Sequence, residues 1–475
     1  MRAKIRKAVV LGAGTMGAAI AGHLAGAGVA VTLLDRPCED GPAKNKFSMD
    51  GKKRILDPKS RLLYARSEGD LISVGNFADD LEKAADADWV VEAVVESLEA
   101  KRDLFAQVAK YVRKDCILSS NTSGISVNAI AEAVPAELRP QFLGTHFFNP
   151  PRYMTLLELI PAKETDPALV EAFAGFAEHR LGKTVLIAND IPNFVANRIG
   201  SANALLIFSG MEKYALTPAM VNLLTGSLIG RPPAGTLRSC DMIGLDIVQS
   251  TCVTNSVIEN DPAEKDLMCG TGYFAAMIER GDTGKKAGQG FFKKSDGGEM
   301  MLDCAGGGYV PYEEPDLPAL SVLGKKAPMK ERIYAVLDSH TAAGDFLWYL
   351  LKWTFSYCAN RVPEITEDFR TIDLAMQLGY NWTYGPFQLW EILGIMEIKS
   401  RMERDGIVLP AWVGAHLPEH GNSFYGGADF SSIIATPLSI HDPSLPVVWS
   451  SDEVILKDLG DGIGCIALAT RGTVP

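Results

Sequence analysis

Residues 7–17, Lys-Ala-Val-Val-Leu-Gly-Ala-Gly-Thr-Met-Gly, decide the fold of this chain. The apolar run at 7–11 ends in glycines, which is typical of a buried strand in a parallel sheet. Small and apolar residues at 15–28 have the spacing of a helix packed on a sheet, and VAVTLL at 29–34 predicts a second strand. A strand, a glycine turn, a helix and another strand predict the start of an α/β fold.

The glycines between the first strand and the first helix have the spacing G-x-G-x-x-G. In this context Gly12 allows a tight turn, Gly14 lets a pyrophosphate approach the backbone, and Gly17 allows close packing of helix on strand. The helix N-terminus adds amide donors and the positive end of the helix dipole. We therefore expect a dinucleotide to bind at Gly12, Gly14, Thr15, Met16 and Gly17.

Asp35 closes the second strand, within the expected range for the acid that binds a ribose 2′-hydroxyl. A carboxylate there repels a 2′-phosphate, so the sequence favours NAD over NADP. The positive charge of the neighbouring Arg36 favours NADP instead.

Further strands are predicted at 89–95, 116–121 and 142–148, separated by helical stretches. Alternating strands and helices predict a doubly wound parallel sheet of the Rossmann type, followed by all-α C-terminal units. The polar segment between Asp35 and Asn76 is interpreted as an insertion into this sheet.

The chain after Pro192 has a different character, with helices predicted at 192–215 and 236–258 and a Gly-rich break at 281–308. A second helical region, a Pro/Gly/Ser-rich loop and an apolar hairpin at 454–469 follow. The predicted parts are the NAD-binding domain 1–190, a helical substrate or dimerisation-type domain 191–300, a linker 301–329, a second, degenerate helical unit 330–404, a linker or draped loop 405–447 and a hairpin 448–475.

A weak internal repeat relates the two helical regions. Residues 235–244 and 385–394 each have a glycine followed six residues later by an acid, Asp241 or Glu391, and nine residues later by another glycine. Two related helical units explain this pattern, and so do two unrelated helices that share a common spacing.

Composition excludes several classes of function. The net charge of −12 argues against an electrostatic nucleic-acid binder, which normally has a basic face. The eight cysteines form no C-x-x-C pair, so no metal site or disulfide framework is expected, and they suit a reducing compartment. No apolar run is long enough to span a bilayer. We expect a cytoplasmic protein without a membrane span.

His146 is the candidate general base among seven histidines, because it ends a predicted strand of the sheet. Ligands of open α/β sheets bind at these strand ends, and imidazole accepts a proton near neutral pH. Glu158 follows in the strand-like run LLELI. A carboxylate on the other ring nitrogen would fix the tautomer and stabilise the imidazolium, but spacing alone does not determine whether Glu158 reaches His146.

Six motifs, GAGTMG, VVEAVVESLEAK, SSNTSGISV, HFFNPPRYMTLLELI, PNFVANRI and GKKAGQGFF, occur in this order over roughly residues 5–293. Together they closely resemble the L-3-hydroxyacyl-CoA dehydrogenase family of fatty-acid β-oxidation. The resemblance implies that His146 is the catalytic base, Glu158 its partner, and Ser123 and Asn197 the residues that hold the substrate. For NAD it points to Asp35, Glu96, Lys101, Asn121, Asn149 and Lys286, although Lys101 and Lys286 also suit surface or capping roles.

Three regions depart from the family pattern. In residues 36–76 a cluster of cations could meet CoA phosphates or be a solvated loop, so no CoA contact is assigned to Lys44, Lys46, Lys52, Lys53 or Arg54. The second helical unit, at 363–394, resembles the duplicated half of multifunctional β-oxidation proteins, and we expect it to be structural. The tail at 449–469 resembles the opening hairpin of a crotonase-type enoyl-CoA hydratase, which suggests a truncated or split fusion without hydratase activity.

The resemblance implies oxidation of (S)-3-hydroxyacyl-CoA to 3-oxoacyl-CoA with NAD. It leaves room for a homodimer or for association with other β-oxidation enzymes. Two other functions fit the residues less fully: a dehydrogenase of a free hydroxy acid, and a non-catalytic NAD-binding subunit. Turnover that is lost in His146→Ala separates the last of these from the enzymes.

Overall fold

The computed structural model describes residues 4–39, 43–258, 271–323, 327–426, 447–450, 454–460 and 463–468. The chain divides into two compact units, Met1–Asp190 with Asp429–Pro475, and Ile191–Ala428. The name first unit is used below for residues 1–190, and the name second unit for residues 191–428. Each unit is described by itself below. Among the described residues, no helix combines the length and the apolar character that crossing a bilayer requires.

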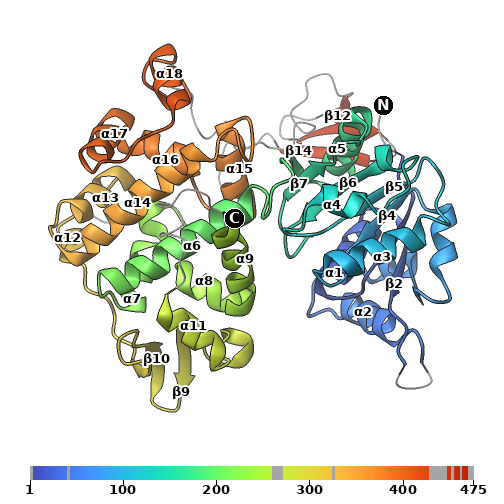
Figure 1. The fold of residues 1–475 in the computed structure, drawn as a ribbon, viewed down its shortest axis with the longest axis horizontal. Coiled ribbons are helices and arrows are strands. Elements are labelled where there is room, and N and C mark those ends of the chain that lie inside the picture. The colour runs from blue at the N-terminus through green and yellow to red at the C-terminus, as the bar shows by residue number, and fades with distance from the viewer. Residues whose placement is uncertain are drawn as a thin grey trace. The chain divides into compact units, whose positions relative to one another are not determined.

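The first unit alternates strands and helices, as the sequence predicts (Figure 1). Its strands are β1 Lys7–Leu11, β2 Ala30–Asp35, β3 Ile72–Asn76, β4 Trp89–Glu92, β5 Ile117–Ser120, β6 Phe142–Phe147, β7 Leu156–Pro161 and β8 Thr184–Ile187. Its helices are α1 Thr15–Gly26, α2 Lys46–Leu56, α3 Leu98–Val108, α4 Val127–Ala131 and α5 Pro167–Leu181, with short 3₁₀ turns η1 Arg66–Leu71, η2 Leu81–Asp86 and η3 Arg139–Gln141.

The eight strands form one sheet in the order β3-β2-β1-β4-β5-β6-β7-β8. The chain winds outward from β1 in both directions, so the predicted doubly wound Rossmann-type sheet is confirmed. All neighbouring strands are parallel except β6 and β7, which are antiparallel. Only residues 148–155 join β6 to β7, and a connection this short allows an antiparallel pair but not a parallel crossover.

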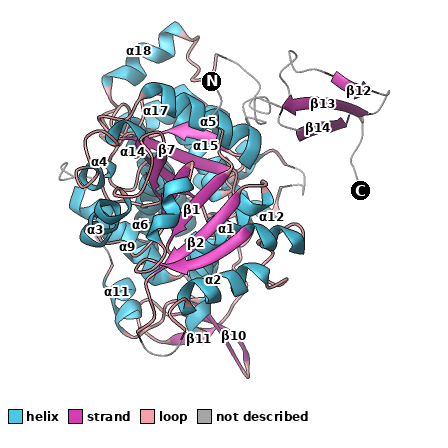
Figure 2. Cartoon of the chain, turned by 90° about the vertical axis from the view of Figure 1, so that its right-hand side faces the viewer, coloured by secondary structure: helices cyan, strands magenta, loops and turns pink. Residues whose placement is uncertain are grey.

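Helices cover both faces of this sheet (Figure 2). On one face, α1 and α5 share a core with the strands, in which Ile20 and Phe173 are fully buried with Val10 and Trp89. On the other face, the ring of Phe105 in α3 packs edge-on against Phe142 in β6, with 5.0 Å between ring centroids. Burial on both faces explains why the strands are continuous apolar runs in the sequence.

The segment after Asp35 differs from the predicted insertion, because it contains a helix and adds a strand to the sheet. Strand β3 pairs in parallel with β2, from Val31 opposite Ile72 to Asp35 opposite Asn76. The sequence ISVGN of β3 is short and has polar residues, which fits an edge strand, and this composition hid it among the loop residues.

The second unit is mainly helical. Its elements are α6 Ala196–Lys213, α7 Pro218–Leu224, η4 Ser227–Ile229, α8 Thr236–Ile243, α9 Leu245–Ile258, α11 Gly272–Glu279, η5 Lys285–Ala287, β9 Phe292–Ser295, β10 Gly298–Leu302, β11 Tyr309–Pro311, α12 Pro318–Ser321, α13 Met329–Leu337, α14 Ala342–Asn360, α15 Phe369–Tyr380, α16 Pro386–Leu393, α17 Ile395–Arg404 and α18 Ala411–Glu419. The helix predicted at 236–258 is two helices, because Gly244 takes a φ of 108° between α8 and α9.

The expectation of an all-α second unit is wrong in one place. Strands β9 and β10, within the Gly-rich stretch at 281–308, form a small antiparallel sheet with β11, in the order β11-β10-β9. Gly298 has a φ of 119° at the turn between β9 and β10, a conformation in which glycine is favoured. The Gly-rich stretch that was predicted to be a break between helical regions is therefore partly a β-hairpin.

Matching contacts in the two helical regions support the duplication over a chance similarity. Asn222 in α7 accepts a hydrogen bond from the backbone NH of Leu237 at 2.9 Å. Asp373 in α15 accepts one from the backbone NH of Phe387, also at 2.9 Å. In both places a Cβ on the glycine before the next helix, Gly235 or Gly385, would collide with this side chain at 2.5 Å or less.

In each half of the duplicated region, an acidic side chain also accepts hydrogen bonds from two consecutive backbone NH groups. The carboxylate of Asp241 accepts hydrogen bonds from the backbone NH groups of Phe291 and Phe292, at 2.9 and 3.0 Å. The acid at the repeated position, Glu391, accepts them from Phe424 and Tyr425, at 3.0 and 3.3 Å. The second half therefore continues beyond residue 404.

The predicted loop at 405–447 is accordingly wrong for its first part, where α18 forms and the chain then returns to Glu391. The rest of that loop, residues 427–446, lies outside the described residues. The predicted tail hairpin is confirmed as β13 Val454–Gly460 paired with β14 Ile463–Leu468, and β12 Val447–Ser450 adds a third antiparallel strand. Asp461 and Gly462 of the predicted turn also lie outside the described residues.

A chemical difference between the halves, Asn222 in one and Asp373 in the other, predicts a dependence of stability on pH. Burial raises the pKa of Asp373 to about 7, against the hydrogen bonds that lower it. Between pH of about 4, where an unfolded aspartate titrates, and neutral pH, the folded protein holds a proton that the unfolded chain has released. The contribution of Asp373 to stability therefore falls as pH rises through this range. Asp373→Asn, which copies Asn222, is expected to reduce this slope, because an amide does not titrate in this range.

Thermal unfolding from pH 5 to pH 8 measures this effect. Asp368→Asn is the matched control, because Asp368 is an exposed N-cap on the same helix and asparagine also caps helices well. The same slope in wild type and Asp373→Asn would contradict the assignment.

Candidate active site

The candidate residues of the first unit gather at one edge of the sheet because the parallel strands are in register. Leu11 lies opposite both Leu34 and Glu92, Glu92 opposite Ser120, and Ser120 opposite Gly144. The residues that follow these positions are at the carboxyl ends of β1, β2, β4, β5 and β6. Ligands of doubly wound folds bind at this edge.

The glycine turn has the geometry that a pyrophosphate requires. Gly12 has a φ of 104°, and a Cβ on it would lie 2.5 Å from the carbonyl oxygen of Ala93. A Cβ on Gly17 would lie 1.8 Å from the carbonyl oxygen of Gly12, so both glycines are required by packing. Gly14 is exposed, and a Cβ there would meet nothing within 4 Å. The open side of the turn is therefore at Gly14, where the first turn of α1 has no side-chain cap.

Asp35 lies beside this turn. Its Oδ2 accepts a hydrogen bond from the backbone NH of Ala13 at 2.6 Å, and its Oδ1 accepts one from the backbone NH of Arg36 at 2.7 Å. The guanidinium of Arg36 lies over the ring of Phe47, 4.7 Å from its centroid. Asp35 is therefore held at the glycine turn while Arg36 packs on α2.

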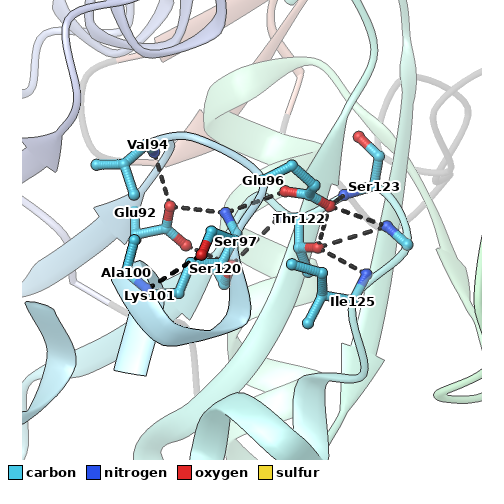
Figure 3. A network of polar contacts seen from close by, with 11 residues as sticks. Glu92, Val94, Glu96, Ser97, Ala100, Lys101, Ser120, Thr122, Ser123 and Ile125 are labelled. Atoms are coloured by element: carbon cyan, nitrogen blue, oxygen red, sulfur yellow. Dashed lines mark hydrogen bonds and ion pairs between the residues drawn. The ribbon is translucent and has the colours of Figure 1, made fainter. Parts of the chain in front are cut away.

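A buried charge network joins the ends of β4 and β5 (Figure 3). The ammonium of Lys101 in α3 lies 2.8 Å from Glu92 and 3.1 Å from Glu96, and the side chain of Lys101 is only 1% exposed. Glu92 also accepts hydrogen bonds from the Ser120 hydroxyl at 2.6 Å and from the backbone NH of Val94 at 2.7 Å. The charge of Lys101 thus compensates carboxylates that the sheet buries.

Glu96 holds the loop that carries Ser123. Its Oε1 accepts hydrogen bonds from the Thr122 hydroxyl at 2.5 Å and from the backbone NH groups of Ser123 and Gly124 at 2.9 and 3.2 Å. Burial alone would raise the pKa of Glu96, but the charge of Lys101 and these hydrogen bonds outweigh it and lower the pKa. The loop after β5 is therefore fixed by an ionised side chain.

His146 and Glu158 form the central pair of the site. They lie directly opposite each other on the antiparallel strands β6 and β7. The Nδ1–H of His146 donates to Oε2 of Glu158 at 2.7 Å, and the two side chains are 4% and 0% exposed. Asn121 at the end of β5 accepts a hydrogen bond from the backbone NH of Phe147 at 2.9 Å, which ties the next strand to the pair.

Comparison with known proteins identifies the family. Residues 7–191 match the model described as 3-hydroxyacyl-CoA dehydrogenase, NAD binding domain, and residues 194–294 match the model of the C-terminal domain of the same family. A "probable 3-hydroxyacyl-CoA dehydrogenase" of Deinococcus radiodurans is 46% identical over 292 residues, which cover 62% of this chain and 84% of that protein. The chain belongs to the 3-hydroxyacyl-CoA dehydrogenase family. The resemblance drawn from the six motifs is therefore confirmed, and the first unit is its NAD-binding domain.

Two further comparisons extend beyond the family domains. A "probable 3-hydroxyacyl-CoA dehydrogenase" of Bacillus subtilis is 38% identical over 499 residues, which cover 99% of this chain and 63% of that protein. The chain thus spans less than two thirds of the length of this relative. The solved structure of a 3-hydroxybutyryl-CoA dehydrogenase from Escherichia coli covers 90% of this chain and 97% of its own, with a TM-score of 0.64. Its 21% identity makes this a likeness of fold.

The remaining 3-hydroxyacyl-CoA dehydrogenase site predictions fall in two places. In the first unit, Ser123 is partly exposed in the loop held by Glu96, and Asn149 is exposed just after β6. Asn197 and Lys286 belong to the second unit, where Lys286 forms an ion pair with Asp246 at 2.6 Å. The site residues that were predicted between 12 and 158 lie in the first unit, and the roles of these residues and of the two in the second unit stay predictions.

Sequence reasoning missed two residues that support the site of this family member. Glu92 is the fully buried acid that pairs with Lys101. It is the first glutamate of VVEAVVE, and a charged residue inside this apolar run was the signal that could have revealed a buried ion pair. Lys183 is 1% exposed and donates to the carbonyl oxygens of Pro151 and Met154, in the loop after the HFFNP motif. Burial lowers the pKa of Lys183 to about 7. A single lysine in LGKTVL has no motif that could have revealed this role.

Asp35 allows a test of cofactor choice. Asp35→Asn is expected to raise KM for NAD about tenfold, the loss of roughly one charge-assisted hydrogen bond, and to improve use of NADP by removing the repulsive charge. Initial rates with each cofactor measure the ratio of the two kcat/KM values. Asp86→Asn, an 83% exposed acid away from the glycine turn, is the control and should leave this ratio unchanged. An unchanged ratio in Asp35→Asn would remove Asp35 from the cofactor site.

Proposed function

We propose that this chain oxidises (S)-3-hydroxyacyl-CoA to 3-oxoacyl-CoA with NAD, as a dehydrogenase of fatty-acid β-oxidation. The observation that carries the proposal is the buried His146–Glu158 pair at the carboxyl edge of the NAD-binding sheet. An alcohol loses a proton and a hydride when it is oxidised, so the site needs a base beside a hydride acceptor. Membership of the 3-hydroxyacyl-CoA dehydrogenase family supports this substrate class.

The geometry of the pair suits proton abstraction. Because Nδ1–H donates to Glu158, the neutral ring has its lone pair on Nε2, which is the atom that would take the proton of the 3-hydroxyl. Glu158 then stabilises the imidazolium that forms, as carboxylates do in other catalytic pairs. NAD, when bound, supplies the acceptor for the hydride that leaves C3.

We assign the other residues from the resemblance of the motifs to those of the family. Ser123 in the fixed loop and Asn197 in α6 would bind the oxygens of the substrate. The cofactor would be held by the glycine turn and by residues at the strand ends, namely Gly12, Gly14, Thr15, Met16, Gly17, Asp35, Asn121 and Asn149, with Lys286 from the second unit. Glu96 and Lys101 would act mainly through the loop at 122–124.

We also propose that the protein works in the cytoplasm and associates with other β-oxidation enzymes. Six cysteines in the described residues are free thiols, and four of them are buried, which suits a reducing compartment. Such an association would pass acyl-CoA between enzymes that act on it in turn.

A substrate panel tests the proposed function. The full chain is assayed with NAD and (S)-3-hydroxyacyl-CoA thioesters of increasing chain length, and the formation of NADH is followed by absorbance. The matched arm contains the same hydroxy acids without CoA. Turnover that requires the thioester supports the proposal, whereas turnover of the free acids, or of neither set, contradicts it.

A further inference from the structure

Asn197 makes its side-chain contact with a residue from the other half of the duplicated region. Asn197 lies in the first turn of α6, and Tyr380 is the last residue of α15. The hydroxyl of Tyr380 donates a hydrogen bond to Oδ1 of Asn197 at 3.1 Å. The two residues are 183 positions apart in the chain, and both belong to the second compact unit.

A glycine on α6 makes room for this contact. A Cβ on Gly200 would lie 2.1 Å from Cζ of Tyr380 and 2.2 Å from its hydroxyl oxygen. Glycine in the middle of a helix costs roughly 0.5–1 kcal/mol relative to alanine. Any side chain at position 200 would displace the ring, so the tyrosine reaches Asn197 only because of this glycine.

The backbone of Asn197 is fixed independently. Its carbonyl oxygen accepts a hydrogen bond from the Ser201 hydroxyl at 2.6 Å. Just before α6, Asn193 and Phe194 both have positive φ, 67° and 50°, and the Asn193 amide donates to the carbonyl oxygen of Thr251 at 2.9 Å. These contacts leave one degree of freedom, the orientation of the Asn197 side-chain amide about its last bond.

In the structure, Oδ1 of Asn197 faces Tyr380 and accepts a hydrogen bond from its hydroxyl. An asparagine side chain has an oxygen that accepts and an NH₂ group that donates, and the two ends have nearly the same shape. With Oδ1 bound to the tyrosine hydroxyl, the NH₂ group is the end left for another partner. Within the described ranges, this NH₂ group has no hydrogen-bond acceptor in the protein.

We propose that Tyr380 is a positioning residue of the dehydrogenase: it orients the Asn197 amide so that its NH₂ group donates to an oxygen of the acyl-CoA substrate. The inference rests on the proposed function, which gives Asn197 its role toward substrate. It also gives the second helical half a task in the reaction, where the sequence led us to expect a structural role alone. Tyr380 itself need not touch the substrate.

Tyr380→Phe is the direct test, because it keeps the ring beside Gly200 and removes only the hydroxyl. The full chain is assayed with (S)-3-hydroxybutyryl-CoA and NAD. We expect kcat/KM for the thioester to fall about 5- to 15-fold, the size of one hydrogen bond, while KM for NAD and Tm stay unchanged. Tyr349→Phe is the matched control, since its hydroxyl bonds Ser209 of α6 at 3.0 Å, and it should leave kcat/KM unchanged.

A double-mutant cycle separates positioning from packing. In an Asn197→Ala background, Tyr380→Phe should cause no further fall in kcat/KM, because the group that it orients is gone. Equal falls in both backgrounds, or no fall in wild type, would overturn the inference. If the wild-type chain turns over no 3-hydroxyacyl-CoA in the substrate panel, it is the proposed function that fails.

A second variant disrupts the contact between Tyr380 and Asn197 without changing either residue. Gly200→Ala keeps both the tyrosine and the asparagine but pushes the ring away. It should reproduce the loss in kcat/KM for the thioester that Tyr380→Phe shows, again without a change in KM for NAD. Wild-type kcat/KM in Gly200→Ala, with the protein folded as judged by circular dichroism, would also overturn the inference.

Discussion

His146→Ala is expected to lower kcat with 3-hydroxyacyl-CoA and NAD by about 10²- to 10⁴-fold, the range that a positioned general base contributes. The side chain is 4% exposed and bound to Glu158. The expected loss is in kcat, because the base acts on a proton that moves in the transition state. Steady-state rates of NADH formation measure it.

Glu158→Gln is the companion variant. An amide can no longer accept a hydrogen bond with a full negative charge, so the imidazolium loses its stabilisation and kcat should fall by a smaller factor than in His146→Ala. Binding of NAD, followed by the quenching of protein fluorescence, should be the same in both variants and wild type. Full activity in His146→Ala would reduce the pair to a structural contact and leave a non-catalytic or different site as the explanation.

Lys101→Met is expected to lower the free energy of unfolding by about 3–5 kcal/mol, the largest loss of stability that we predict. The substitution leaves Glu92, which is 0% exposed, without the cation that compensates its charge. It also removes the main charge that lowers the pKa of Glu96, and the loop at 122–124 depends on that carboxylate. Urea unfolding of the full chain, followed by far-ultraviolet circular dichroism, measures the change.

Two variants make this prediction specific. Lys83→Met removes a partly exposed ion pair with Asp80 and should cost less than about 1 kcal/mol. Adding Glu92→Gln to Lys101→Met removes the uncompensated charge and should recover part of the loss. Equal effects of Lys101→Met and Lys83→Met would mean that the buried network has no special role in stability.

The sequence allowed the first unit to be predicted well, because its signals are local. The glycine spacing at 12–17 and the apolar strands specify both the sheet and the NAD site, and the winding order follows from them. The spacing of His146 and Glu158 in the sequence did not determine whether the two side chains form a pair. It depends on the register between β6 and β7, which the connecting loop and the core determine together.

The second unit was harder to predict, because its decisive contacts join residues that are distant in the chain. Glu391 meets Phe424 and Tyr425 only after α18 has returned the chain, so these residues seemed to belong to a loop. The contact between Tyr380 and Asn197 has no sequence motif of its own. Gly200 was a possible signal, since a glycine inside a long helix usually marks a close approach.

The cross-strand placement of His146 and Glu158 affects how this site can change during evolution. A shift of one residue between β6 and β7 would turn Glu158 to the opposite face, and it would move Leu157 and Leu159 out of the core at the same time. Selection for a folded sheet therefore preserves the distance between the two side chains, even where activity is not selected. Relatives that have lost the reaction should have replaced one of these two residues and kept the strand pairing intact.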